Sequence, residues 1–278
     1  MPNSISIDET NVAGSLLVLV CTYNERVNID QLIHSIHQAV PAADILVMDD
    51  ASPDGTADAV QKAIESEKYG DQLKLQVRAG KLGLGSAIRD GLHFAMRHGY
   101  ELAVNLDADF SHDPAAIPDL LAAMNALPEN ADADRVRLVI GSRYVENGGL
   151  VNCSWKRKLV SKAANAYARW LLDWKIKDCS SAYRCYRVDS LRFLPWDEIQ
   201  CNGYGFLEEI LWHILHWNDK SESNRQASNQ RVVEVPIIYT ERALGSSKIS
   251  MAEATGTLEV LHKLRRLTQV GVGQSRRD

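Results

Sequence analysis

The stretch LLVLVCTYNE at residues 16–25 joins an apolar run to a polar end. Its first six residues are apolar without alternation, which is typical of a strand that helices cover on both faces. Apolar residues then recur at helical spacing from Ile29 to Ile36, which predicts a helix between Glu25 and Val40. A buried strand followed by an amphipathic helix is the repeating unit of a parallel α/β sheet.

The same alternation continues along the chain. Further strands are expected at Ile45–Met48, Leu73–Val77, Leu102–Leu106, Val136–Ile140 and Arg231–Tyr239, and further helices from Thr56, over Gly83–His98, over Gly205–Trp217 and over Ser250–Leu267. We therefore predict an α/β fold with a Rossmann-like, doubly wound and mostly parallel sheet that helices flank.

The composition of the 278 residues excludes several classes of protein. Hydrophobic residues make up 45% and charged residues 24%, as in folded globular domains, so global disorder is excluded. The net charge of −5 argues against a basic coat for nucleic acid, and we expect no nucleic-acid partner. The five cysteines form no Cys-x-x-Cys pair, which predicts reduced thiols and a cytoplasmic location.

Polar clusters close four of the predicted strands. They are Thr22-Tyr23-Asn24-Glu25, Asp49-Asp50, Asp107-Ala108-Asp109 and Gly141-Ser142-Arg143. Ligands of open α/β sheets bind beyond the carboxyl ends of the strands, so these clusters mark the expected site. Any one of them alone would be interpreted as an ordinary polar loop.

Asp107 and Asp109 stand two residues apart after an apolar strand. In an extended backbone such residues point the same way, so their carboxylates can converge on one point. Paired carboxylates with open positions suit Mg²⁺ or Mn²⁺ held jointly with a substrate pyrophosphate. The alternative is a solvated pair of aspartates at a turn before Pro114, and the further acids at Asp49 and Asp50 favour the metal.

Two glycine-containing segments could contact an anion. Lys81 to Ser86 precedes a helix whose backbone N–H groups could face a phosphate, and a structural turn is the alternative. Arg242 to Lys248 places two cations around a Gly-Ser turn, which suits a pyrophosphate or a phosphate leaving group. A solvated basic turn is the alternative for this second segment.

The segment Trp155–Arg192 is basic, with ten Lys and Arg against three acids and a local charge of +7. Tryptophans at positions 155, 170 and 174 are interleaved with these charges. The pattern suits a helix that lies at the level of lipid headgroups, near a lipid-borne acceptor. The alternative is a solvated basic face whose tryptophans belong to the core.

Together these residues resemble the family 2 glycosyltransferases with a GT-A fold, and within them the polyprenol-phosphate (dolichol-phosphate) mannosyltransferase branch. The matching blocks are Cys21–Glu25 for the family's Pro-Thr-Tyr-Asn-Glu, Met48–Thr56 for Val-Asp-Asp-x-Ser-Pro-Asp-Gly-Thr, Lys81 with Gly83–Ala87, Asp107–Asp109, Gly141–Tyr144, Asp178–Arg187, Gly203–Phe206 with Glu209, and Arg242 with Gly245–Lys248. The resemblance runs in order over about residues 16–268, which makes chance agreement improbable.

The resemblance implies an inverting hexosyltransferase that moves a mannosyl group from GDP-mannose to a polyprenyl phosphate with Mg²⁺ or Mn²⁺. It implies nucleotide-sugar contacts from Thr22, Tyr23, Glu25, Asp49, Asp50, Lys81, Gly85, Asp107, Asp109, Arg242 and Lys248. It implies metal ligation by Asp107, Asp109 and Ser111, with His112, water or a carbonyl as alternatives for the third ligand, because some relatives have glutamine at position 111. It implies catalytic roles for Asp109, Arg143, Arg242 and Lys248. An acceptor phosphate is already anionic, so we assign no protein base or nucleophile.

We expect one glycosyltransferase domain over residues 15–268, with a nucleotide-sugar half at 15–145 and an acceptor-side and membrane-side half at 146–268. Residues 1–14 and 269–278 are expected to be flexible. The strongest apolar run is too short to cross a bilayer, which takes about 20 residues, so any attachment would be peripheral, at the cytoplasmic membrane face. Two other functions remain open: a family 2 enzyme with a UDP-sugar or a non-lipid acceptor, and a non-catalytic regulator that binds a nucleotide sugar.

Overall fold

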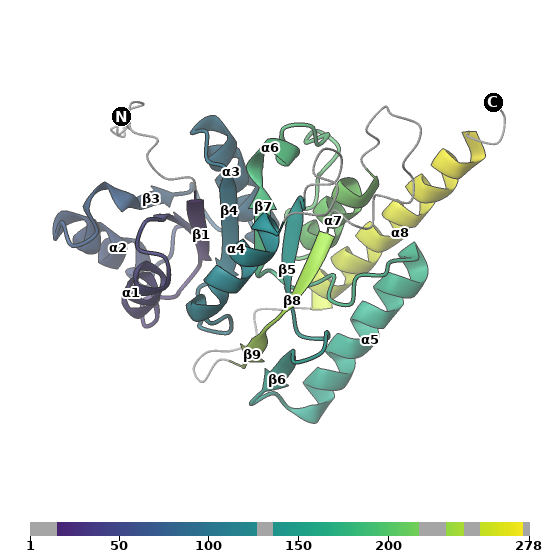
Figure 1. The fold of residues 1–278 in the computed structure, drawn as a ribbon, viewed down its shortest axis with the longest axis horizontal. Helices are drawn as coiled ribbons and strands as arrows, with labels where there is room; N and C mark the ends of the chain where they lie inside the picture. Colours follow the sequence, from purple (N-terminus) through teal and green to yellow (C-terminus); the bar gives the residue numbers. More distant parts are fainter. Residues whose placement is uncertain (1–15, 127–135, 217–231, 242–250, 275–278) are drawn as a thin grey trace.

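A computed structural model describes residues 16–126, 136–216, 232–241 and 251–274 (Figure 1). The elements in chain order are β1 (Leu16–Thr22), α1 (Ile29–Ala39), β2 (Asp44–Asp49), α2 (Thr56–Glu65), η1 (Gly70–Gln72), β3 (Leu73–Val77), α3 (Leu84–Arg97), β4 (Leu102–Asp107), η2 (Pro114–Ala116), α4 (Ile117–Asn125), β5 (Leu138–Ser142), β6 (Gly149–Val151), α5 (Trp155–Leu172), β7 (Arg184–Arg187), α6 (Val188–Leu191), α7 (Phe206–His216), β8 (Val232–Pro236), β9 (Ile238–Thr240) and α8 (Met251–Gln274).

The central sheet has the strand order β3-β2-β1-β4-β7-β5-β8. The pairs β1–β2, β1–β4, β2–β3 and β5–β8 are parallel, whereas β7 is antiparallel to both of its neighbours. The predicted α/β fold with a mostly parallel sheet is therefore confirmed. The sequence prediction missed β7, because its charged residues Arg184 and Arg187 conceal a strand inserted between β4 and β5.

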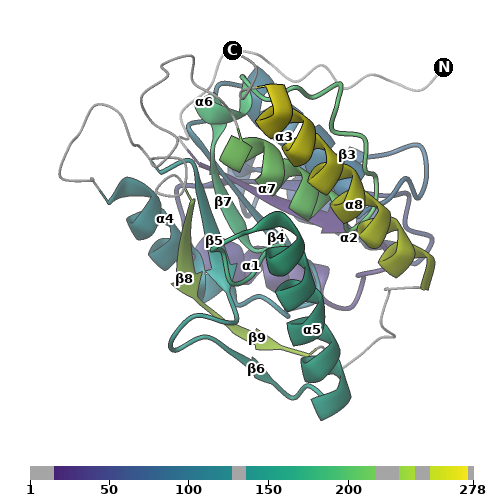
Figure 2. The ribbon, with the colours of Figure 1, turned by 90° about the vertical axis from the view of Figure 1, so that its right-hand side faces the viewer.

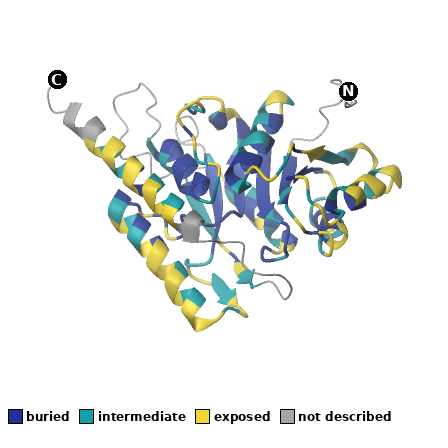
Figure 3. Cartoon of the chain, turned by 180° about the vertical axis from the view of Figure 1, so that it is seen from behind, coloured by how far each residue is buried: buried dark blue, intermediate teal, exposed yellow. Residues whose placement is uncertain are grey.

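The strands are buried because their side chains alternate between two apolar cores. In β1, Leu17 and Leu19 belong to the core formed with α3, α5, α6, α7 and α8. Val18 and Val20 belong to the core formed with α1, α2 and α4 on the other face. Figure 3 shows these strands as buried between the helices. The unbroken apolar run at the start of β1 thus has the origin that was expected of it.

The predicted strand over 231–239 is two strands, which corrects the sequence prediction. β8 pairs with β5 in the large sheet, and β9 pairs with β6 in a separate two-stranded sheet. Between them, the N–H of Ile237 donates to Ser142 O and its carbonyl accepts from Gly149 N–H, each at 3.0 Å. Pro236 is in register with Ser142 on the edge strand β8, a position where the absence of an N–H costs no ladder hydrogen bond, and the chain changes sheets at Ile237.

The basic segment Trp155–Arg192 is divided among α5, β7 and α6. Trp155 and Trp170 are 70% and 76% exposed, whereas Trp174 is buried. The alternative that the tryptophans belong to the core therefore holds for Trp174 and not for Trp155 or Trp170, and the contact with lipid headgroups stays a prediction. Within the described residues, none of the helices combines the length and the apolar character that crossing a membrane requires.

Helix α8 continues to Gln274, past the predicted end at Leu267. The helix thus extends beyond its predicted end, and the flexibility expected of residues 269–278 stays a prediction. Gly271 and Gly273 each weaken a helix by about 1 kcal/mol, but unlike proline they keep their N–H groups, so they do not end it. The other predicted flexible segment, 1–14, lies outside the described residues, and the division at residue 145 stays a prediction.

Candidate active site at the carboxyl edge of the sheet

The carboxyl ends of β1, β2 and β4 lie side by side. Thr22 at the end of β1 is in register with Asp49 of β2, and Cys21 is in register with Asp107 of β4. Three of the four predicted polar clusters therefore meet at neighbouring positions of the sheet. The fourth follows β5, which runs in the same direction as β4 because both are antiparallel to β7.

Asp49 is completely buried and fixes the ends of β1 and β2. Its Oδ1 accepts hydrogen bonds from Thr22 Oγ1 at 2.8 Å and from Ser52 Oγ at 2.6 Å, and its Oδ2 accepts from Ser52 N–H at 2.8 Å. These bonds use three of about four acceptor positions of the carboxylate. Asp49 and Thr22 thus connect the loops that follow β1 and β2, and their polar atoms are used mainly in these internal hydrogen bonds.

The loop after β1 is fastened to the loop after β2. Glu25 N–H donates to Thr56 Oγ1 at 3.0 Å, and Arg26 N–H donates to Asp54 Oδ2 at 3.0 Å. The Glu25 carboxylate accepts from Asn28 Nδ2 at 3.0 Å, at the start of α1. Predicted site residue Glu25 is therefore buried in a braced loop, which presents Tyr23 at its outer end.

Asp50 lies in a buried ion pair with Arg78, a residue that the sequence analysis missed. Oδ1 of Asp50 accepts from Arg78 Nη1, and Oδ2 accepts from the N–H groups of Leu82 and Gly83 at 3.0 and 3.1 Å. Arg78 also donates to Ser86 Oγ at 2.8 Å. Asp50 therefore anchors the loop that carries Lys81. The available signal for Arg78 was its position directly after the predicted strand Leu73–Val77.

The glycines of this loop are required by packing against the segment before α7. A Cβ on Gly83 would lie 2.5 Å from Asn202 O, and one on Gly85 would lie 2.5 Å from both Gly203 O and the Phe206 Cβ. Gly83 also has φ +100°, which favours glycine. The geometry matches the structural-turn alternative for Gly85, while Lys81 lies with its Nζ 4.5 Å from the centroid of the Tyr23 ring.

Asp107 is the last residue of β4, and Asp109 follows the strand, as predicted. Asp109 Oδ1 accepts from Ser111 N–H at 3.0 Å, around a turn in which Phe110 has φ +58°. The Ser111 hydroxyl is buried and, among the described residues, makes no hydrogen bond of normal geometry. Two carboxylates and a hydroxyl are hard oxygen donors, the type that Mg²⁺ and Mn²⁺ prefer, so the residues present fit a divalent cation.

His112 supports the metal loop in its neutral form. The N–H of Asp107 donates to His112 Nδ1 at 3.2 Å, so the ring proton lies on Nε2. Burial lowers the pKa of His112 to about 4, and the charge of Arg143 lowers it further. Nδ1 is thus occupied by this hydrogen bond, and the identity of the third metal ligand stays a prediction.

Arg143, after β5, is held by Asp178. Its Nε and Nη2 donate to the two Asp178 oxygens, each at 2.7 Å, and its backbone N–H donates to Oδ2 at 2.9 Å. Asp178 is fully buried. Burial lowers the pKa of Arg143, but the hydrogen bonds and charge of Asp178 outweigh burial, so the net pKa is raised. Arg143 is therefore a fixed cation at this edge, and Asp178 is a second residue that the list of candidates omitted.

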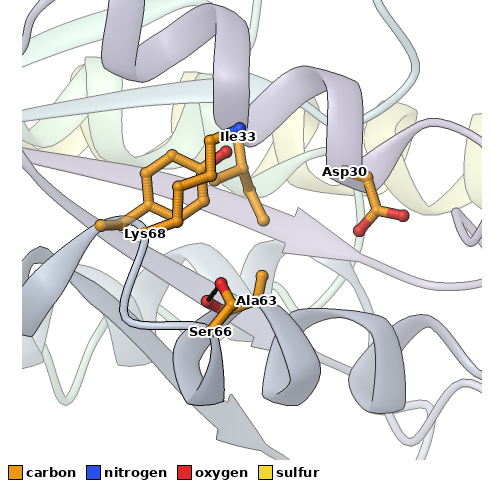
Figure 4. Close-up of a pocket in the computed structure, with 6 residues that line it drawn as sticks. Asp30, Ile33, Ala63, Ser66 and Lys68 are labelled. Carbon is orange, nitrogen blue, oxygen red and sulfur yellow. Dashed lines mark hydrogen bonds between the residues drawn. The ribbon is translucent and has the colours of Figure 1, made fainter.

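Arg242 and Lys248 lie outside the described residues. A pocket of about 180 Å³ lies elsewhere, between α1 and the end of α2 (Figure 4). Its lining residues are Asp30, Ile33, Ala63, Ser66, Lys68 and Tyr69, none of which was a predicted site residue. Among the described residues, no group of three or more His, Cys, Asp or Glu is placed to hold a metal. A cation held by Asp107 and Asp109 would therefore need further oxygen ligands from a bound substrate or from water.

The chain is similar to known proteins in sequence and in fold. The model for the family described as glycosyl transferase family 2 fits residues 17–194. The chain belongs to glycosyl transferase family 2. It is therefore a hexosyltransferase, as the sequence predicted. Two relatives are polyprenol monophosphomannose synthase of Mycolicibacterium smegmatis (38% identical, covering 84% of this chain and 80% of that one) and undecaprenyl-phosphate mannosyltransferase of Micrococcus luteus (38%, 84% and 87%).

The fold of this chain is similar to those of several solved structures. Mannosyl-3-phosphoglycerate synthase from Rubrobacter xylanophilus has a TM-score of 0.60 at 18% identity, over 92% of this chain and 74% of its own. Glucosyl-3-phosphoglycerate synthase from Mycobacterium tuberculosis, with Mn²⁺, UDP-glucose and phosphoglyceric acid, has a TM-score of 0.59 at 17% identity, over 90% and 79%. The predicted GT-A fold is thus confirmed.

Proposed function

We propose that this family 2 enzyme transfers a mannosyl group from GDP-mannose to a polyprenyl phosphate. The observation that carries the proposal is the 38% identity, over 84% of the chain, with two enzymes named for mannosyl transfer to polyprenyl phosphates. The edge of the sheet supports it, because acids suited to a nucleotide sugar and its metal lie beside Arg143, a cation suited to a phosphate.

Asp107, Asp109 and Ser111 would hold Mg²⁺ or Mn²⁺ at this edge. When bound, the cation would neutralise charge that develops on the diphosphate. The chain itself supplies the placement: the Asp109 carboxylate is fixed by Ser111 N–H, and the backbone of Asp107 is fixed by His112. Tyr23 and Lys81 would contact the nucleotide, with Asp49, Asp50, Thr22 and Glu25 holding their loops.

The acceptor phosphate oxygen would form a bond to the anomeric carbon as the bond from that carbon to the diphosphate oxygen breaks. The nucleoside diphosphate leaves with the electron pair, and a single displacement inverts the anomeric centre, from an α-linked donor to a β-linked product. Since the attacking phosphate is anionic, no proton must be removed from it. Arg143, Arg242 and Lys248 would balance the charges of the phosphates.

The outer face of α5 would contact an anionic lipid surface. Trp155, Leu159 and Trp170 are 70%, 60% and 76% exposed, and they recur at spacings that place them on one face of the helix. Lys156 and Lys162, in the same helix, are also exposed. Exposed aromatic and aliphatic side chains flanked by lysines match the interface of a bilayer with acidic headgroups.

Incubation of the enzyme with polyprenyl phosphate, Mn²⁺ and either radiolabelled GDP-mannose or radiolabelled UDP-glucose tests the substrates. We expect label to enter the organic phase only with GDP-mannose. Label from UDP-glucose alone would favour the UDP-sugar alternative, and GDP-mannose transfer to a water-soluble acceptor alone would exclude the lipid phosphate. Tight donor binding with no transfer to any acceptor would favour the non-catalytic regulator.

Co-sedimentation with vesicles tests the membrane contact separately. We expect binding to vesicles that contain phosphatidylglycerol and weak binding to pure phosphatidylcholine, with the difference reduced at high salt. Binding that does not depend on anionic lipid would contradict the proposed role of the lysines on α5.

A further inference from the structure

Tyr239 of β9 lies where several parts of the molecule meet. Its ring is edge-on to the His112 ring, with centroids 5.6 Å apart, and the Arg143 guanidinium carbon lies 5.5 Å from its centroid. Its hydroxyl accepts a hydrogen bond of 3.4 Å from Arg157 Nη2. Its backbone is in register with Leu150 of β6. One side chain therefore touches the metal loop, the fixed cation of the site and helix α5.

The strand that carries Tyr239 is fastened to the metal loop. The next residue, Thr240, donates its N–H to Ser111 O at 3.1 Å. The N–H of the same Ser111 donates to Asp109 Oδ1 at 3.0 Å. A displacement of β9 would therefore also displace Ser111 and the Asp109 carboxylate, which would hold the metal.

Arg157 forms the other end of this link. It lies in the first turn of α5, between the exposed Trp155 and Leu159, and its Nη1 pairs with Glu241. Glu241 N–H in turn donates to Val151 O of β6 at 3.0 Å. Figures 1 and 2 both show the start of α5 beside β6 and β9. Arg157 therefore faces β9 from the same helical turn whose other residues face solvent.

A second contact joins α5 to the site at a different point. The Tyr144 hydroxyl and Ser161 Oγ are hydrogen-bonded at 2.6 Å, and Tyr144 directly follows Arg143. The Arg143 guanidinium carbon lies 5.3 Å from the Tyr144 ring centroid. Two consecutive turns of the inner face of α5 thus contact the two aromatic rings that lie against Arg143.

We propose that Arg157 and Tyr239 are positioning residues that couple the placement of α5 on a lipid surface to the geometry of the metal loop and of Arg143. The proposal rests on the membrane contact proposed above. Binding to the lipid surface would favour one position of α5 relative to the sheet. Through Arg157 and Tyr239, it would restrict the conformations of the segment Asp107–Asp109 and of Arg143. Such coupling is reciprocal, so metal and nucleotide at the site would strengthen docking. The consequence is that donor turnover is favoured where the lipid acceptor is found.

Hydrogen–deuterium exchange tests the coupling without any substrate. The probe is a vesicle of phosphatidylglycerol and phosphatidylcholine that lacks polyprenyl phosphate, and the readout is amide exchange over residues 107–112. With wild type we expect vesicles to slow this exchange about fivefold, the lower end of usual coupling between sites. Arg157→Lys keeps the charge but not the fork that reaches both Tyr239 and Glu241, and Tyr239→Phe keeps the ring but not the hydroxyl. Both variants should bind vesicles and lose most of the slowing.

Lys62→Arg, at an exposed position of α2 outside the proposed lipid contact, is the matched control and should retain the full response. The proposal is overturned if wild type co-sediments with the vesicles and exchange over 107–112 does not change, or if Arg157→Lys and Tyr239→Phe respond like wild type. Failure of wild type to bind vesicles would overturn both the docking and the coupling, whereas mannosyl transfer in detergent would then still support the proposed reaction. A general loss of structure in a variant would appear as faster exchange in β1 and β4 without vesicles.

Discussion

The two halves of the carboxyl edge are built differently. On the side where we propose that the donor binds (the donor side, at the ends of β1 and β2), Asp49 and Asp50 are buried, and their oxygens accept hydrogen bonds from the neighbouring loops. On the side where we propose that the acceptor binds (the acceptor side, with α5 and α7), α5 exposes Trp155 and Trp170, which the described protein leaves uncovered. The first half is complete before substrate binds, whereas the second has an apolar surface whose proposed partner is a lipid. Substitutions should therefore affect folding on the donor side and surface binding on α5.

The largest expected effect is on the donor side. Asp50→Ala leaves the buried Arg78 with only the half-exposed Asp90 as a carboxylate partner, which should lower the free energy of unfolding by about 3 kcal/mol, the lower end for breaking a buried pair. Asp90→Ala is the matched control, because Asp90 also contacts Arg78, at 3.0 Å, but its side chain is 44% exposed. That variant should lose about 1 kcal/mol or less. Urea titration measures both, and equal losses would show that the donor side is not held by buried pairs.

A second effect concerns the buried Glu208 of α7. Burial raises its pKa from 4.5 to about 7, and Asp178 adds to this, although Arg184 and Arg143 lower it. Because the folded pKa lies above the unfolded one, the stabilising contribution of the protonated carboxyl is complete below pH 4.5 and is lost as the pH rises through 7. The Glu208→Gln variant has no ionisable group at this position, so it does not lose this contribution. Its free energy of unfolding relative to that of wild type should therefore rise by on the order of 3 kcal/mol between pH 4 and pH 8.

Denaturant titration at several pH values measures this difference. Glu208→Asp, which keeps a titratable carboxyl, is the control and should follow the slope of wild type. If the free energy of unfolding of Glu208→Gln depended on pH as that of wild type does, the prediction would be contradicted. The pH dependence would then arise from groups other than Glu208.

The third effect is on activity. Asp109→Ala should lower metal-dependent transfer about 100-fold, or about 2.7 kcal/mol of transition-state stabilisation, because the loop loses a carboxylate. Asp119→Ala removes an exposed acid from the following helix and should leave the rate unchanged. Initial rates over a range of Mn²⁺ concentrations provide the test, and full metal-dependent transfer by the Asp109 variant would exclude it as a ligand.

The smallest expected effect is on the acceptor side. Trp155→Ser or Trp170→Ser should weaken binding to anionic vesicles about fivefold each, the equivalent of about 1 kcal/mol for partial burial of an indole. Neither should change the free energy of unfolding by more than about 0.5 kcal/mol. Trp174→Ser should lower the free energy of unfolding without weakening vesicle binding, since Trp174 is buried. If all three tryptophans behaved alike in co-sedimentation and unfolding, the contrast between the two halves would be wrong.

Local sequence was sufficient wherever a signal lies within one segment. The apolar runs at β1 and before Asp107 report burial directly, and both strands were placed correctly. Convergence of the Asp107 and Asp109 carboxylates stays a prediction. Arg78 and Tyr239 gave no comparable signal. Their importance arises from partners far along the chain, Asp50 and Arg143, and no local periodicity contains such pairs.

The sequence by itself determined the mostly parallel α/β sheet and which strand ends carry acids. It determined these because side-chain periodicity and apolar runs encode burial one element at a time. The tertiary structure alone decided that β7 enters the sheet against the others, that Gly85 is needed for packing, and that Trp155 is exposed while Trp174 is buried. These outcomes depend on which elements meet in space, because the same basic, aromatic segment can face either solvent or a core until its neighbours are placed.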